Sequence, residues 1–246
     1  HSSAPGFAKQ LCGQGSAVTA KSGPRIATCA FANPSPSRSD LMSASLKLHW
    51  SPKSPYVRKV MICAHELDLM PRLTLARSVA AMLKPNPDIM ADNPLSKIPT
   101  LVREDGLVLF DSLVICEYLN ELGHGTLFPA TGDDKWRALR WHALGDGMLD
   151  ALILWRNERE RAQPLQTLID AFDLKIRACL AQLDEEAAAL WQSPLTIGTL
   201  TIGCALGYAD YRFDSLGWRA LAPRLAAWFA TLEQRPSFQA TRPVDG

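Results

Sequence analysis

Residues 46–66 read LKLHWSPKSPYVRKVMICAHE, and this stretch joins a strand pattern to a helix pattern through a serine. Leu46, Leu48 and Trp50 alternate with polar residues, which is the period of a strand with one buried face. From Val57 onward, apolar residues recur with the spacing of one helical face. The stretch therefore predicts a strand followed directly by an amphipathic helix.

Ser54 lies at the start of that helix. The serine falls at the expected N-cap and Pro55 at the first helical position, where a missing N–H group costs nothing. A helix start carries unpaired N–H groups and a partial positive charge, so a hydroxyl held there lies in a place that favours an anion. We therefore regard Ser54 as the first candidate functional residue.

Composition narrows the class of protein. The chain has 246 residues, enough for two modest domains, and 47% of them are hydrophobic. A net charge of +1 gives no general attraction to nucleic acid or to an anionic membrane, and no apolar run approaches the ~20 residues that span a bilayer. The six cysteines are scattered, without a CxxC pair, and four of them have apolar neighbours. Buried thiols and a cytoplasmic location are expected.

Residues 1–41 differ in composition from the rest of the chain. Ser, Ala, Gly and Pro dominate, and no acidic residue precedes Asp40. Such a segment buries too little apolar surface to offset its ordering entropy. It loosely resembles an organelle transit peptide, but we expect a disordered upstream extension, with Met42 as the natural start.

Residues 46–124 predict an α/β domain. In chain order we expect a strand at 46–50, a helix at about 55–68, a strand at 72–75, β-rich runs at 98–103 and 107–110, and a helix from 112 to the glycines at 123 and 125. Asp105-Gly106 between the two β-rich runs is a strong hairpin signal. Residues 125–132 predict a linker, and the helical patterns of residues 133–240 predict an all-α domain.

Two further segments are candidate binding elements. Pro99 opens a predicted strand, and an X-Pro bond in that place can be cis, which would expose the preceding backbone groups. Asp111 and Ser112 end one strand and begin a helix, where either side chain can cap the helix. A carboxylate beside a hydroxyl and free N–H groups could also hold a ligand that bears both an ammonium and a carboxylate.

The order of these motifs resembles that of cytosolic glutathione transferases, most closely the bacterial serine-type members. The motifs are Ser54-Pro55-Tyr56-Val57-Arg58-Lys59, Asn93-Pro94-Leu95-Ser96-Lys97-Ile98-Pro99, Asp111-Ser112-x-x-Ile115-x-x-Tyr118-Leu119, Pro223-x-Leu225-x-x-Trp228 and Arg235-Pro236-Ser237-Phe238. The match covers roughly residues 46–240 and keeps the family's order. The resemblance implies a thioredoxin-like N-terminal domain that binds glutathione and an all-α C-terminal domain that lines the electrophile pocket. It also implies a homodimer.

The resemblance assigns roles to individual residues. Ser54 corresponds to the hydroxyl that activates the glutathione thiol, and Tyr56 is a possible accessory donor. The expected glutathione-binding residues are Lys97 for the glycyl carboxylate, Ile98 for the cysteinyl backbone, Pro99 as the family's cis proline, Asp111 for the γ-glutamyl ammonium and Ser112 for its carboxylate. Many relatives have Glu or Gln where this chain has Asp111, so the side chain expected to meet the ammonium has a shorter reach here.

Thiol acidity explains why a hydroxyl is needed. A thiol with a pKa near 8.5 is only slightly ionised at neutral pH, yet the thiolate is the nucleophile. Lowering that pKa by roughly two units requires about 2.7 kcal/mol of preferential thiolate stabilisation, which one hydrogen-bond donor and a helix start can supply. Ser54 is therefore expected to donate a hydrogen bond and not to attack, and serine, unlike cysteine, excludes mixed-disulfide exchange at this position.

The sequence thus predicts a detoxifying glutathione transferase that conjugates glutathione to a small hydrophobic electrophile. Glutathione is the co-substrate, and no prosthetic group, metal, nucleic acid or membrane partner is expected. Two alternatives stay open: a transferase-fold interaction or stress protein without turnover, and a glutathione-dependent isomerase or dehalogenase that uses the same site.

Overall fold

A computed structural model describes residues 45–245, and the expectation for residues 1–41 lies outside them. Four strands form one mixed sheet in the order β2-β1-β3-β4: β1 (Leu46–Trp50), β2 (Leu73–Arg77), β3 (Thr100–Val102) and β4 (Val108–Leu109). β1 runs parallel to β2 and antiparallel to β3, and β3 pairs antiparallel with β4 across the predicted hairpin. This arrangement is the expected thioredoxin-like sheet.

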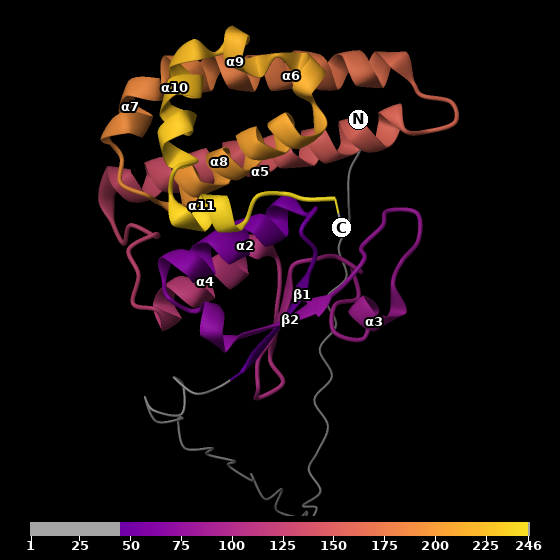
Figure 1. Ribbon diagram of the computed structural model, residues 1–246, viewed down its shortest axis with the longest axis vertical. Helices are drawn as coiled ribbons and strands as arrows, with labels where there is room; N and C mark the ends of the chain where they lie inside the picture. The colour runs from indigo at the N-terminus through magenta and orange to yellow at the C-terminus, as the bar shows by residue number, and fades with distance from the viewer. Residues whose placement is uncertain (1–44, 246) are drawn as a thin grey trace, which may run out of the picture. The chain divides into compact units, whose positions relative to one another are not determined.

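Two helices of this N-terminal domain, α2 (Pro55–Glu66) and α4 (Ser112–Leu122), lie side by side between the sheet and the helical region (Figure 1). A short 3-10 turn (Met70–Arg72) follows α2, so β2 begins one residue later than predicted. The helix α3 (Pro87–Met90) lies between β2 and β3. The strand predicted at 72–75 therefore exists but begins at Leu73 and ends at Arg77.

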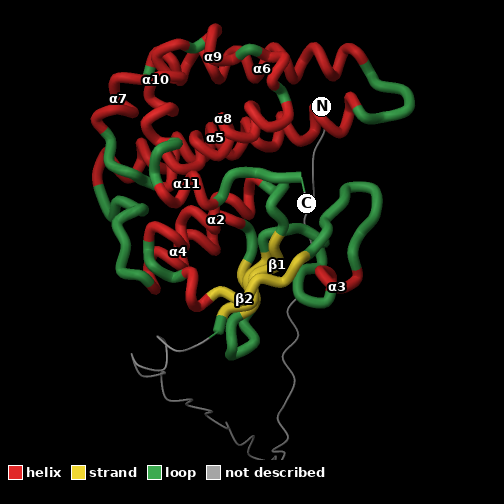
Figure 2. Tube along the Cα trace, viewed as in Figure 1, coloured by secondary structure: helices red, strands yellow, loops and turns green. Residues whose placement is uncertain are grey.

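The chain after residue 131 is helical to residue 240, interrupted by short turns (Figure 2). Its helices are α5 (Gly132–Arg159), α6 (Gln166–Glu185), α7 (Ala187–Gln192), α8 (Ile197–Arg212), α9 (Trp218–Leu221), α10 (Pro223–Leu232) and α11 (Pro236–Ala240), with a 3-10 turn at Asp214–Leu216. A capping box opens α8, because the side chains of Thr196 and Thr199 each accept a hydrogen bond from the other's backbone N–H. The domain boundaries, with a linker at 125–132, stay a prediction.

α5 and α8 pack against each other, and α8 also covers α2. α2 is buried on more than its apolar face, since Arg58 and Lys59 are both buried. Arg58 Nη2 donates to the Phe238 carbonyl at 3.3 Å, and its Nη1 lies so close to Gly207 that a Cβ there would sit 2.1 Å away. Gly207 thus leaves the space that the Arg58 guanidinium occupies between α2 and α8.

Cys63, Cys116 and Cys204 are buried free thiols and Cys179 is partly buried, as the sequence predicted. Between residues 45 and 245, no helix is long and apolar enough to cross a membrane.

Candidate functional site

The register of the sheet brings three of the predicted site segments to one end. His49 pairs with Thr100, and Leu101 pairs with Leu109. Because β1 and β4 both run antiparallel to β3, the residues after β1, before β3 and after β4 share one end of the sheet. These residues are the loop to Ser54, the Ile98-Pro99 pair and the Asp111-Ser112 pair.

Ser54 is the N-cap of α2. Its Oγ accepts a hydrogen bond from the Val57 N–H at 3.3 Å, and its backbone is extended, as an N-cap requires. That bond uses a lone pair of the hydroxyl, so the hydroxyl proton is left to be donated elsewhere. The side chain is partly exposed. The residue can therefore cap the helix and donate to a thiolate at the same time.

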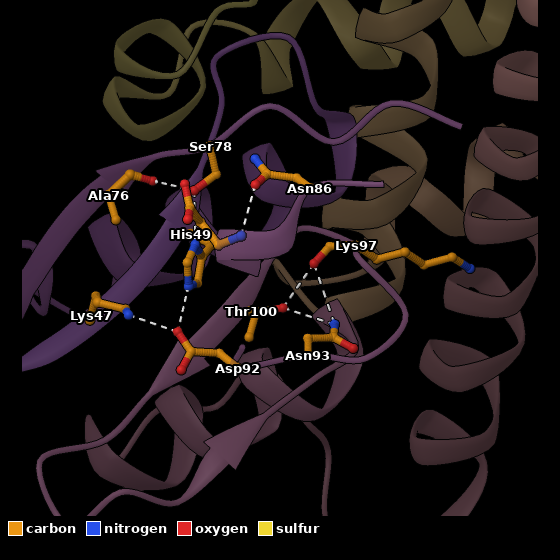
Figure 3. Close-up of polar contacts among 10 residues, drawn as sticks. Lys47, His49, Ala76, Ser78, Asn86, Asp92, Asn93, Lys97 and Thr100 are labelled. Carbon is orange, nitrogen blue, oxygen red and sulfur yellow. Dashed lines mark hydrogen bonds and ion pairs between the residues drawn. The ribbon is translucent and has the colours of Figure 1, made fainter. Parts of the chain in front are cut away.

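The Ile98–Pro99 peptide bond is cis, as the sequence analysis anticipated. A small network fixes the loop before it: the Thr100 hydroxyl donates to the Lys97 carbonyl at 2.8 Å, and Asn93 Nδ2 donates to Thr100 Oγ1 at 2.9 Å (Figure 3). Pro99 is buried and Ile98 partly exposed. The Lys97 side chain is exposed and extends away from this network (Figure 3).

Asp111 and Ser112 begin α4. Asp111 is the N-cap, with Oδ1 accepting from the Leu113 N–H at 3.0 Å, and it remains exposed. Ser112 is the first helical residue and is buried. The carboxylate and the helix start therefore lie side by side, one suited to an ammonium group and the other to a carboxylate.

A second network supports this end of the sheet and was missed by sequence reasoning. His49 was expected on an exposed strand face, but it is buried and bonds to Ser78 Oγ at 2.8 Å and to Asp92 Oδ2 at 2.7 Å (Figure 3). Lys47 Nζ donates to the same Asp92 oxygen at 2.7 Å, and the bonds from His49 and Lys47 hold the pKa of Asp92 below its usual range. No spacing signal links residues 43 positions apart, so only the fold reveals this network.

The Escherichia coli (strain K12) protein "Uncharacterized GST-like protein YibF" is 30% identical to this chain over 205 residues, covering 80% of this chain and 98% of that protein. The family model "Glutathione S-transferase, N-terminal domain" matches residues 53–122. The chain belongs to the glutathione S-transferase family.

Solved structures agree with this membership. A glutathione transferase family member from Pseudomonas fluorescens Pf-5 with bound glutathione is 41% identical, with a TM-score of 0.78, and the match covers 82% of this chain and 100% of that chain. A second Pf-5 structure, with bound S-(propanoic acid)-glutathione, is 42% identical, with a TM-score of 0.76 and the same coverage. The thioredoxin-like sheet with a helical region is therefore the fold of this family.

Tyr56 of this family member contacts the helical region. Its hydroxyl donates to Asp150 Oδ1 on α5. Burial and the Asp150 carboxylate raise the pKa of the phenol far above its ordinary value, so the proton stays on the tyrosine. In this structure that proton is donated to Asp150.

A buried ion cluster lies where α2 meets α5. Lys59 Nζ is 2.5 Å from Asp146 Oδ1 and 3.2 Å from His142 Nε2, and Lys59 is fully buried. Burial and the Lys59 charge lower the pKa of His142 to about 4, so its neutral ring accepts from the Lys59 ammonium at neutral pH. Asp111 also acts on His142 electrostatically. The cluster therefore joins α2 to α5 of the helical region.

The depressed pKa of His142 makes stability depend on pH. In the unfolded chain His142 has its ordinary pKa of 6.5, so between that value and about 4 the unfolded state binds the extra proton. The stability that the neutral His142 contributes is therefore present above pH 6.5 and lost as the pH falls towards 4. From pH 7 to pH 5 the free energy of unfolding should decrease by about 2 kcal/mol. Urea denaturation at both pH values measures this, and His142→Asn should remove most of the difference while His65→Asn should keep it. Equal pH dependence in wild type and His142→Asn would contradict the assignment.

Two pockets, of about 490 and 450 Å³, open near Thr126 and Pro194. Neither contains a predicted site residue, so neither replaces the site at the end of the sheet.

Proposed function

We propose that this protein is a glutathione transferase that joins the thiolate sulfur of glutathione to a small hydrophobic electrophile. The observation that carries the proposal is the hydroxyl of Ser54, which caps α2 with a lone pair and keeps its proton for donation, at the sheet end shared by Ile98-Pro99 and Asp111-Ser112. A thiolate placed there receives one charge-assisted hydrogen bond and lies at a helix start.

Glutathione fits the three segments in one orientation. The Ile98 backbone would pair with the cysteinyl part, Ser54 would donate to the sulfur, and Asp111 and Ser112 would hold the γ-glutamyl ammonium and carboxylate. Lys97 is exposed beside this loop, within the region where the glycyl carboxylate would lie. The Pf-5 relatives with bound glutathione and bound S-(propanoic acid)-glutathione support both the tripeptide and an S-linked substituent as ligands.

The proposal includes a homodimer, carried over from the family resemblance, and a cytoplasmic location, expected from the unpaired, buried cysteines. Detoxification is the corresponding physiological role.

The direct test measures glutathione binding and turnover with the wild-type chain. Glutathione should raise the melting temperature, because a ligand that binds only the folded state stabilises it, and aryl and alkyl halides should consume the thiol. If glutathione neither binds nor is consumed, the reading as an interaction protein without turnover replaces this one.

Asp111→Asn should weaken glutathione binding about tenfold, because the carboxylate that would meet the γ-glutamyl ammonium loses its charge. Asparagine is an equally good N-cap, so α4 should keep its stability. Isothermal titration calorimetry measures the effect, and Asp105→Asn in the exposed hairpin turn is the matched control. Wild-type affinity in Asp111→Asn would remove Asp111 from the site.

A further inference from the structure

A carboxylate from the chain itself is held by three donors beside the candidate site. Asp245 belongs to the segment that follows α11 and runs along α2 (Figure 1). Its Oδ1 accepts from the Tyr211 hydroxyl, lies 3.4 Å from Arg212 Nη2 and is 3.9 Å from Lys53 Nζ. Three side chains from two distant parts of the chain thus converge on one carboxylate oxygen.

The groups around Asp245 are held more firmly than the Asp245 carboxylate itself. Asp245 is exposed, with 71% of its side chain accessible, so it is loosely held. The Nε of Arg212 is buried and has no hydrogen-bond partner among the described residues. Arg212 Nη2 also donates to the Tyr211 hydroxyl at 2.7 Å, which orients both groups. The donor set is fixed, whereas the carboxylate is exchangeable.

Aromatic rings lie next to these donors. The rings of Tyr208 and Tyr211 meet edge to face with centroids 6.4 Å apart, and Arg156 Nη1 donates to the Tyr208 hydroxyl at 3.1 Å. Tyr208 is buried, whereas Tyr211 is partly exposed, so the Tyr211 ring offers apolar surface next to the donors. An apolar or aromatic group can therefore pack on Tyr211 beside the donors that hold a carboxylate.

The sequence position of Lys53 places this cluster near the sulfur. Lys53 directly precedes Ser54, and its Nζ lies 3.9 Å from Asp245 Oδ1. The cluster therefore borders the loop that carries Ser54.

We propose that Lys53, Tyr211 and Arg212 bind a carboxylate on the electrophile, and that Asp245 occupies this subsite until the substrate displaces it. The inference rests on the proposed function and specifies its substrate class: an apolar or aryl electrophile with a carboxylate at the end remote from the reacting carbon. For an aryl chloride the thiolate sulfur forms the new C–S bond, and the chloride leaves with the electron pair of the broken C–Cl bond.

Binding of two conjugates that differ by one carboxylate tests the subsite without requiring turnover. S-(4-carboxybenzyl)glutathione should bind wild type about five- to tenfold more tightly than S-benzylglutathione, as expected for a partly exposed charge-assisted contact. Arg212→Gln and Tyr211→Phe should reduce this preference severalfold and leave the affinity for S-benzylglutathione unchanged. Asp245→Asn should increase the preference, because it removes the competing carboxylate.

Arg177→Gln is the matched control, since Arg177 is an exposed arginine of α6 paired with Asp173. It should keep the wild-type preference. The subsite is refuted if wild type binds the two conjugates equally, or if Arg212→Gln and Tyr211→Phe keep the preference while both remain folded. Displacement of the Asp245 carboxylate is refuted if Asp245→Asn leaves the preference unchanged. Failure to bind S-benzylglutathione and glutathione would instead overturn the proposed function itself.

Discussion

Ser54→Ala is expected to lower kcat/KM for glutathione conjugation by roughly 10- to 100-fold. The serine hydroxyl would donate a charge-assisted hydrogen bond to the thiolate, and loss of such a bond costs about 1.5–3 kcal/mol. Because the bond favours the ionised thiol, its loss should also raise the pKa of bound glutathione. The rate deficit should therefore be largest near neutral pH and diminish at alkaline pH.

A pH–rate profile with one aryl chloride measures both effects. The variant also loses the N-cap of α2, which should cost about 1 kcal/mol of stability, so the rates belong well below its melting temperature. Ser51→Ala is the matched control, because Ser51 lies in the same loop and does not cap the helix. If Ser54→Ala conjugates as fast as wild type, the thiol has another activator.

Asp146→Ala should lower the free energy of unfolding by about 3–5 kcal/mol. Lys59 is fully buried, and removal of its carboxylate partner leaves an ammonium whose remaining contact in this cluster is the neutral His142. An uncompensated buried charge is among the most destabilising changes that a single substitution can cause. Urea denaturation at pH 7 measures the loss.

The double variant Lys59→Met/Asp146→Ala should recover much of this stability, since an apolar side chain of similar length replaces the buried charge. Asp173→Ala is the matched control, because its ion pair with Arg177 is partly exposed and should contribute less than about 1 kcal/mol. If Asp146→Ala is no more destabilising than Asp173→Ala, the Lys59 cluster does not stabilise the contact between α2 and α5.

Much of the fold could be predicted from local pattern. Alternating residues located β1, the Asp105-Gly106 turn located the β3–β4 hairpin, and helical spacing located α2 and α4. These signals work because strand and helix periods, caps and turns depend on neighbours in sequence. The division between α6 and α7 at Glu186 and the short helix α3 were not predicted.

The sequence predicted the candidate site only as separate segments. The strand register seen in the structure was needed to show that these segments meet at one end of the sheet. The burial of His49 and Lys59 was not predictable from hydrophobic period, because each is a polar side chain whose partner, Asp92 or Asp146, lies more than 40 positions away. A buried polar residue is recognised only when the fold brings its partner opposite.

The two buried cations of α2 also constrain how the chain can assemble. A covering surface can close over this helix only if it brings a carboxylate opposite Lys59 and leaves space opposite Arg58, as Asp146 and Gly207 do. A shifted placement of α5 and α8 would leave the Lys59 ammonium without a carboxylate partner or bring a side chain against the Arg58 guanidinium. The two charges therefore favour the one placement of α5 and α8 in which Asp146 meets Lys59 and Gly207 meets Arg58.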